Sequence, residues 1–181
     1  MIVSRKTFMS IGAAALFATG LWAGIGSAGP SGANGETVGL TATLVASKEV
    51  PKPKGVSSRA GGRFTATLVR RGSGGAISWR LTFHNLTGKA VGAHIHRAKP
   101  GVSGPIIVLL CGPCRSGVRG TAKVKAATVR ALLHGGAYVN VHTTKNPAGE
   151  IRGQVKSGVK PTLPPPSTTG TTTTTTTSPY P

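Results

Sequence analysis

The stretch that decides the fold runs from Tyr138 to Gln154 and reads YVNVHTTKNPAGEIRGQ. In its first part, apolar and polar side chains alternate, with Val139 and Val141 on the apolar side. This period of two is typical of a β-strand with one buried face. The NPAG segment at 146–149 predicts a turn, because proline presets its own φ and glycine accepts a positive φ. Alternation resumes after the turn, so the stretch predicts a β-hairpin with one apolar and one polar face.

Further strands are expected before this hairpin. The clearest alternation is in Ala76–His84, and we expect a core centred on Phe64, Trp79 and Phe83. The other expected strands are Val38–Ala46, Arg63–Val69, Val91–His96, Pro105–Leu110 and Val118–Val124. Ala126–His134 has helical spacing and is followed by Gly135, a residue typical of helix ends. About eight short strands with one short helix predict an all-β fold, either an antiparallel β-sandwich or a Greek-key barrel.

Four separated motifs resemble the chordin-type (CHRD) domain in order and spacing. They are the segment ending in EVP at Leu44–Pro51, GAHIH at Gly92–His96, GPIIVL at Gly104–Leu109, and the hairpin itself. The resemblance covers residues 36–157 and implies a domain found in secreted proteins. The growth-factor binding of chordin is not carried over, because a shared fold does not transfer function.

Composition divides the chain into four parts. Residues 1–28 predict a cleaved signal peptide, with Arg5 and Lys6 before an apolar run and small residues before Ala28. The alternative is an uncleaved membrane anchor, because the run approaches spanning length; after cleavage no membrane span is expected. We expect a linker at 29–35, the CHRD-type β domain at 36–157, and a disordered Thr/Pro-rich tail at 158–181. The expected location is secreted or associated with the cell envelope, by either the general secretory or the twin-arginine route.

Charge and composition narrow the class of function. The chain has 22 Lys and Arg against three Glu and no Asp, giving a net charge of +19. This balance favours contact with anionic surfaces, namely nucleic acid, lipid headgroups or acidic polymers of the envelope; the alternative is solubility of an exported protein. Most of the few aromatic residues of the domain are expected in the core, which disfavours nucleic acid as a partner. Without Asp or paired carboxylates, common hydrolytic sites are disfavoured. We therefore expect a binding or structural module rather than an enzyme, with an anionic polymer or another protein as partner.

The polar faces of two strands carry the candidate site. His94 and His96 flank Ile95, so their side chains are expected on one face of a strand. Their Cα atoms should be roughly 6.6 Å apart, which is two strand steps. With His142 they are candidate ligands for Zn or Cu. The His-x-His strand also resembles copper–zinc superoxide dismutase, whose Asp and further His ligands are missing here.

The alternative is a metal-free network in which Glu150 and Arg152 form an ion pair. In both cases we expect one polar cluster, consisting of His94, His96, Asn140, His142, Glu150 and Arg152. The position of the His94–His96 strand beside the hairpin rests on the resemblance to the CHRD domain.

The two cysteines lie in the tetrapeptide Cys111-Gly-Pro-Cys114, which is also found in thioredoxin active sites. No βαβ pattern surrounds it, and the residues after Cys114 are typical of a loop. In an exported chain, we expect Cys111 and Cys114 to form a local structural disulfide.

Overall fold

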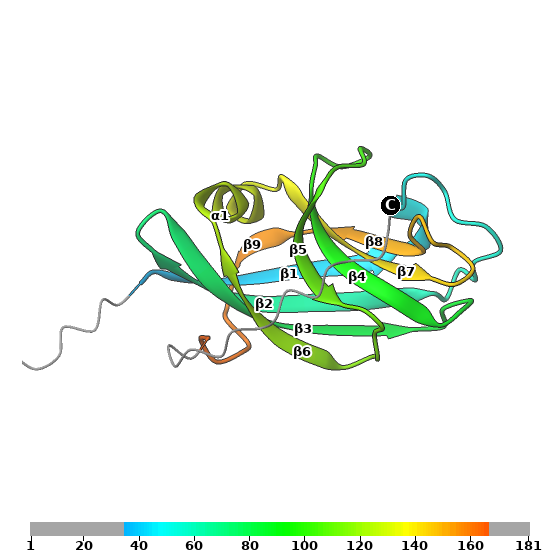
Figure 1. The fold of residues 1–181 in the computed structure, drawn as a ribbon, viewed down its shortest axis with the longest axis horizontal. Helices are drawn as coiled ribbons and strands as arrows, with labels where there is room; N and C mark the ends of the chain where they lie inside the picture. The colour runs from blue at the N-terminus through cyan, green and yellow to red at the C-terminus, as the bar shows by residue number, and fades with distance from the viewer. Residues whose placement is uncertain (1–34, 167–181) are drawn as a thin grey trace, which may run out of the picture. The chain divides into compact units, whose positions relative to one another are not determined.

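Nine antiparallel strands form one nearly closed, barrel-like sheet in the computed structural model, which describes residues 35–166 (Figure 1). The strands are β1 (Thr37–Val45), β2 (Gly61–Arg71), β3 (Gly74–His84), β4 (Ala90–Arg97), β5 (Ile106–Cys111), β6 (Val118–Val124), β7 (Ala137–Thr143), β8 (Ile151–Gln154) and β9 (Lys156–Val159). One α-helix, α1 (Ala126–Leu133), and a short 3-10 helix, η1 (Ala46–Lys48), complete the elements of this part of the chain. The predicted signal peptide and the tail beyond residue 166 lie outside the described residues.

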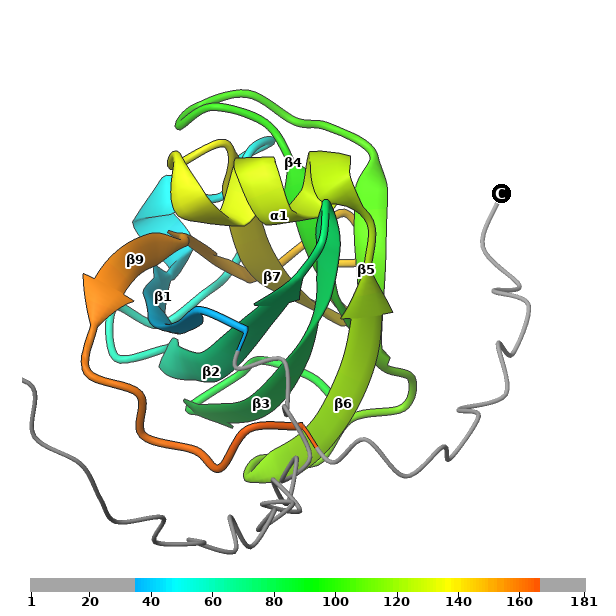
Figure 2. The same cartoon turned by 90° about the vertical axis from the view of Figure 1, so that its left-hand side faces the viewer.

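The all-β prediction is confirmed, and the single antiparallel sheet curves into a nearly closed, barrel-like form. The strand order is β5-β4-β7-β8-β1-β2-β3-β6, with β9 paired to β1 beside β8. Seen from one end, the strands curve around a common interior, and α1 lies across that end (Figure 2). The terminal strands β5 and β6 are joined by the loop that holds the Cys111–Cys114 disulfide, as the sequence predicts.

The interior is filled by the apolar residues that alternate along the strands. Fully buried members include Phe64, Ile77, Leu81, Ile95, Val139, Val141 and Ile151. Trp79 is also buried, whereas Phe83 is only partly buried and packs at the margin of the core. Phe83 is the penultimate residue of β3, where the interior ends, so its predicted place at the centre of the core was wrong.

The predicted helix is confirmed as α1, which adds Val129 and Leu132 to the core. It ends one residue earlier than predicted. Gly135 follows it with φ 70°, a backbone conformation that suits glycine at a helix end. Within residues 35–166, no helix has the length and apolarity needed to cross a membrane.

The ninth strand was not predicted. The expected domain boundary at Ser157 lies inside β9, because β8 pairs with β1 only at Val45 and leaves the rest of that edge for β9. The chain then continues along the sheet, where the Thr67 hydroxyl donates to the Leu163 carbonyl at 2.7 Å. Pro164 accepts a similar bond from Ser78. Proline-rich sequence suggested disorder from residue 158, yet its carbonyls still accept hydrogen bonds from strand side chains.

Candidate metal centre

The register of β4, β7 and β8 places the predicted polar residues side by side. His94 pairs with Asn140, and Gly92 pairs with His142, across β4 and β7. Asn140 in turn pairs with Arg152 across β7 and β8. Directly opposed residues of an antiparallel pair point to the same face. These side chains therefore gather on the face opposite the core residues of the same strands.

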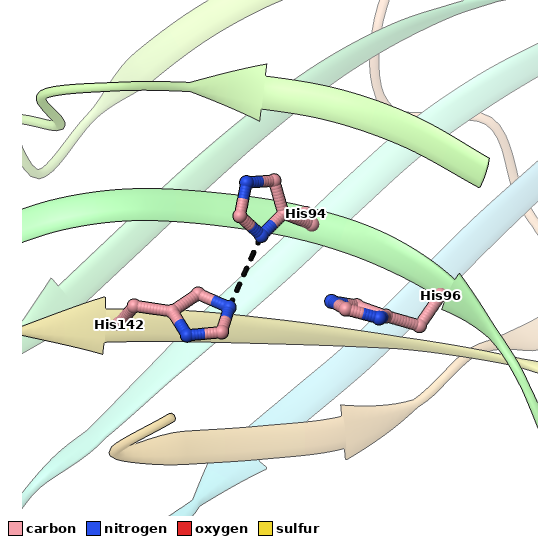
Figure 3. A group of neighbouring side chains, drawn as sticks. All are labelled: His94, His96 and His142. Atoms are coloured by element: carbon pink, nitrogen blue, oxygen red, sulfur yellow. Dashed lines mark hydrogen bonds between the residues drawn. The ribbon is translucent and has the colours of Figure 1, made fainter. Parts of the chain in front are cut away.

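The three histidines converge as the sequence predicts. One ring nitrogen from each of His94, His96 and His142 lies within 4.8 Å of the others. His94 Nδ1 is 3.1 Å from His142 Nε2, and the His96 ring points toward the same space (Figure 3). His94 and His96 are almost fully buried, and His142 is half-buried. A shared space bordered by three imidazoles is an arrangement that can hold Zn or Cu.

Backbone carbonyls fix the tautomers of two of these rings. His96 Nδ1–H donates to the Gly104 carbonyl at 2.8 Å, and His142 Nδ1–H donates to the Pro147 carbonyl at 2.8 Å. A carbonyl only accepts, so each neutral ring carries its lone pair on Nε2. His96 Nε2 is buried and has no hydrogen-bond partner. Metal-binding histidines are oriented in this way, by a second ring N–H held by the protein.

Burial keeps all three rings uncharged. Desolvation, followed by the neighbouring His142 and His96, lowers the pKa of His94 from 6.5 to about 4. Desolvation also lowers the pKa of His96 and of His142, although the bonds to Gly104 and Pro147 oppose it. Neutral imidazole is the form that binds a metal, so these lowered pKa values favour the metal-binding form of the three rings at neutral pH.

Asn140 lies at the middle of the centre. Its Oδ1 is 3.0 Å from His142 Nε2, whereas its Nδ2 and Glu49 Oε2 both lie beside Gly149, and the amide lowers the pKa of Glu49. A Cβ placed on Gly149 would be 2.5 Å from Glu49 Oε2 and 3.1 Å from Asn140 Nδ2. Gly149, with φ 129°, therefore leaves the space in which these two groups face each other.

Glu49 is the site residue that sequence reasoning missed. It is fully buried, accepts from Val50 N–H at 3.0 Å, and leaves Oε2 without a partner. Desolvation raises its pKa to about 7, against the opposing effects of Val50 N–H, Arg152 and Asn140. Its only sequence signal was its place in the EVP motif, which identified the domain but gave no role to the carboxyl group.

Arg152 joins the centre through an aromatic ring and forms no ion pair with Glu150. Its Cζ lies 3.4 Å from the centroid of the Tyr138 ring, and the His96 ring stacks on Tyr138 at 4.8 Å. Arg152 Nη2 donates to the carbonyls of Lys99 and Val102. The ion pair expected in the metal-free alternative is therefore wrong: backbone carbonyls and a cation–π contact hold the guanidinium instead.

Glu150 belongs to a separate network, which corrects its predicted place beside the histidines. Its carboxylate accepts from Thr87 N–H and Oγ1 at 2.7 Å each, from Thr143 Oγ1 at 2.6 Å, and from Asn146 Nδ2 at 3.3 Å. Burial alone would raise the pKa of Glu150, but these bonds outweigh it and lower the pKa. The residue precedes β8, so the strand period that relates Arg152 to Gln154 does not extend to it.

Comparison with known proteins identifies the family. The family model of the CHRD domain matches residues 40–155, which is more than half of the chain. The chain therefore belongs to the CHRD domain family, and its barrel-like sheet with the centre on β4, β7 and β8 is a structure of such a domain. No curated protein matches the chain, and no solved structure does.

Proposed function

We propose that this CHRD-domain protein is an exported binding module of the cell envelope or extracellular space, and not an enzyme. Its functional centre binds one Cu or Zn ion through His94, His96 and His142. The observation that carries the proposal is the buried Nε2 of His96, which has a lone pair, no partner, and two further imidazoles beside it.

A metal-free cluster explains this arrangement less well. A buried polar atom without a partner costs free energy, roughly 1–3 kcal/mol. The fixed tautomers leave Nε2 of His96 and Nε2 of His142 each with a lone pair and no proton, in the same part of the centre. A bound Cu or Zn ion supplies the positive charge that these nitrogens lack.

Metal analysis of the protein purified without an affinity tag tests the proposal. We expect one Cu or Zn per chain in the wild type and none in His96→Ala, because the variant removes a ligand. His134→Ala is the matched control, since His134 is exposed at the end of α1. A wild type that takes up neither ion from a metal-loaded buffer would overturn the metal function.

Export is supported by the basic and apolar pattern of residues 1–28 and by the intramolecular disulfide. We expect the mature chain to begin at Gly29 and to be recovered from the envelope or the medium. N-terminal sequencing of the native protein checks this. A chain recovered from the cytosol that still begins at Met1 would contradict export.

A further inference from the structure

We infer that Asn140 supplies an oxygen ligand to the same ion, and that Glu49 is the positioning residue that aims it. The centre is then a three-nitrogen, one-oxygen site that selects divalent Cu or Zn over Cu(I). This inference rests on the proposed function and adds a fourth ligand and an ion class to it.

The first argument is a contact between two acceptors. His142 Nδ1–H donates to Pro147, so Nε2 of this ring is an acceptor, and it faces Asn140 Oδ1 at 3.0 Å. Two acceptors at that separation repel each other unless a cation or a proton lies between them. A proton on this nitrogen would make the ring an imidazolium beside the buried His94 and His96 rings, at centroid distances of 4.9 and 6.1 Å, where burial disfavours a charge. A metal ion bound by both atoms turns the repulsion into attraction.

The second argument concerns the orientation of the Asn140 amide. Nδ2 lies on the side of the Glu49 carboxyl, near Oε2, across the space left by Gly149. A reversed amide would place its oxygen against the carboxyl oxygen and its N–H groups toward the histidines. The carboxyl oxygen, as an acceptor, therefore stabilises the orientation in which Oδ1 faces the metal-binding nitrogens, which is how a second residue orients a metal ligand.

The third argument concerns the ligand atoms, which are nitrogen and oxygen and include no sulfur. Imidazole nitrogen and amide oxygen suit divalent Cu and Zn, whereas Cu(I) prefers thiolate and thioether sulfur. Both cysteines are bound in the disulfide, and the two methionines of the chain are Met1 and Met9, within the predicted signal peptide. The described centre therefore contains no sulfur donor.

The experiment measures affinity for Cu(II), Zn(II) and Cu(I) by chelator competition on the mature, tag-free protein. We expect Asn140→Ala to lower Cu(II) and Zn(II) affinity by at least 10-fold and to change Cu(I) affinity less than about threefold. It should also change the electron paramagnetic resonance spectrum of bound Cu(II). The double variant Asn140→Asp/Glu49→Gln keeps an oxygen ligand and sets an N–H group against the second Asp oxygen, so it should bind Cu(II) at least as tightly as the wild type.

Two further variants separate positioning from folding. Glu49→Gln should lower Cu(II) affinity by about 10–100-fold at unchanged stoichiometry, the range found for residues that orient a ligand. Gln154→Ala is the control, because it removes an amide from β8 that bonds only to the Ala98 and Gly135 carbonyls, and it should leave affinity and spectrum unchanged.

The outcomes distinguish this inference from the metal function itself. If Asn140→Ala binds Cu(II) with wild-type affinity and spectrum while His96→Ala loses the ion, the oxygen ligand is refuted and the histidine site stands. If Asn140→Ala does not fold, as judged by circular dichroism, the double variant Asn140→Asp/Glu49→Gln decides: a loss of Cu(II) affinity of 10-fold or more overturns the inference. If the wild type binds no metal, both proposals fall.

Discussion

Glu49 and His94 are buried groups whose pKa shifts act on stability with opposite dependence on pH. The pKa of His94 falls from 6.5 to about 4, so acidification from 6.5 to 4 protonates the unfolded chain first and destabilises the fold. The pKa of Glu49 rises from 4.5 to about 7. The protonated Glu49 carboxyl therefore contributes fully to the free energy of unfolding below pH 4.5, and this contribution is lost as the pH rises through 7. The two effects largely cancel in the wild type.

Glu49→Gln should uncouple these effects in the metal-free protein. As the pH rises from 4 to 8, the free energy of unfolding of the variant should increase by about 3 kcal/mol relative to that of the wild type. A shift of one pKa unit corresponds to about 1.4 kcal/mol. Urea unfolding at a series of pH values, with chelator present, measures the difference. A difference between variant and wild type that is independent of pH would show that Glu49 does not titrate in this range.

Gly149 is the backbone position on which the centre depends. Gly149→Ala should destabilise the protein by about 2–4 kcal/mol, because φ 129° is strained for alanine and the new Cβ would collide with the Glu49 carboxyl. Gly55→Ala is the matched control, since Gly55 also has a positive φ, 64°, with open space around it. It should cost only about 1 kcal/mol. Equal losses in the two variants, measured by urea unfolding, would argue against the contact with Glu49.

At the scale of elements, local periodicity predicted most strands because one face of each is buried. The segment around Ile77, Trp79 and Leu81 alternates over nearly its whole length and was predicted almost residue for residue. The β9 strand could not be found in this way. Its side chains are mostly exposed, so it carries no apolar period and is held by backbone pairing with β1.

The same reasoning explains the successes and failures at the centre. Alternation placed His94 and His96 on one face, and it placed Asn140 and His142 on one face of the next strand. Glu49 lies just beyond η1, outside any strand, so no period relates it to these residues. Glu150 is in the turn before β8, where alternation does not hold. The alternation of side chains predicts which residues of a strand share a face, but it does not predict where an irregular segment lies in the fold.

The backbone at the end of β9 lies close to Gly39 of β1, and a substitution at Gly39 tests whether β9 depends on this close approach. A Cβ at this position would collide with the carbonyl oxygens of Val159 and Lys160. We therefore expect Gly39→Ala to displace β9 and to increase amide hydrogen exchange at Lys156–Val159, at a cost of about 1–3 kcal/mol.

Gly72→Ala, in the open turn between β2 and β3, is the control and should leave the exchange of β9 unchanged. Unchanged exchange of β9 in both variants would show that the strand accommodates the added methyl group.

At the scale of the whole molecule, the few acidic groups leave the positive charge almost uncompensated. Glu49 and Glu150 are buried, and Glu36 forms an ion pair with Arg70. Within residues 35–166 this is the single salt bridge, so the other exposed Lys and Arg side chains face solvent without acidic partners. Two of them, Arg97 and Arg130, line a shallow groove beside α1 together with His134. An anionic envelope polymer, one of the two partners expected from the composition, would therefore meet positive charge on many elements.

This distribution predicts binding to anionic polymers that depends on total charge and not on one local site. Affinity for immobilised polyphosphate should fall steadily with added NaCl and be lost near about 1 M, where the Debye length is only about 3 Å. The pairs Arg97→Gln/Arg130→Gln and Arg63→Gln/Arg80→Gln each remove two exposed charges, the first at the groove and the second on β2 and β3. We expect equal losses of affinity from the two pairs, because a diffuse field sums charges wherever they lie. A much larger loss from the groove pair would replace the diffuse field with a defined anion site beside α1, and salt-insensitive binding would exclude an electrostatic origin.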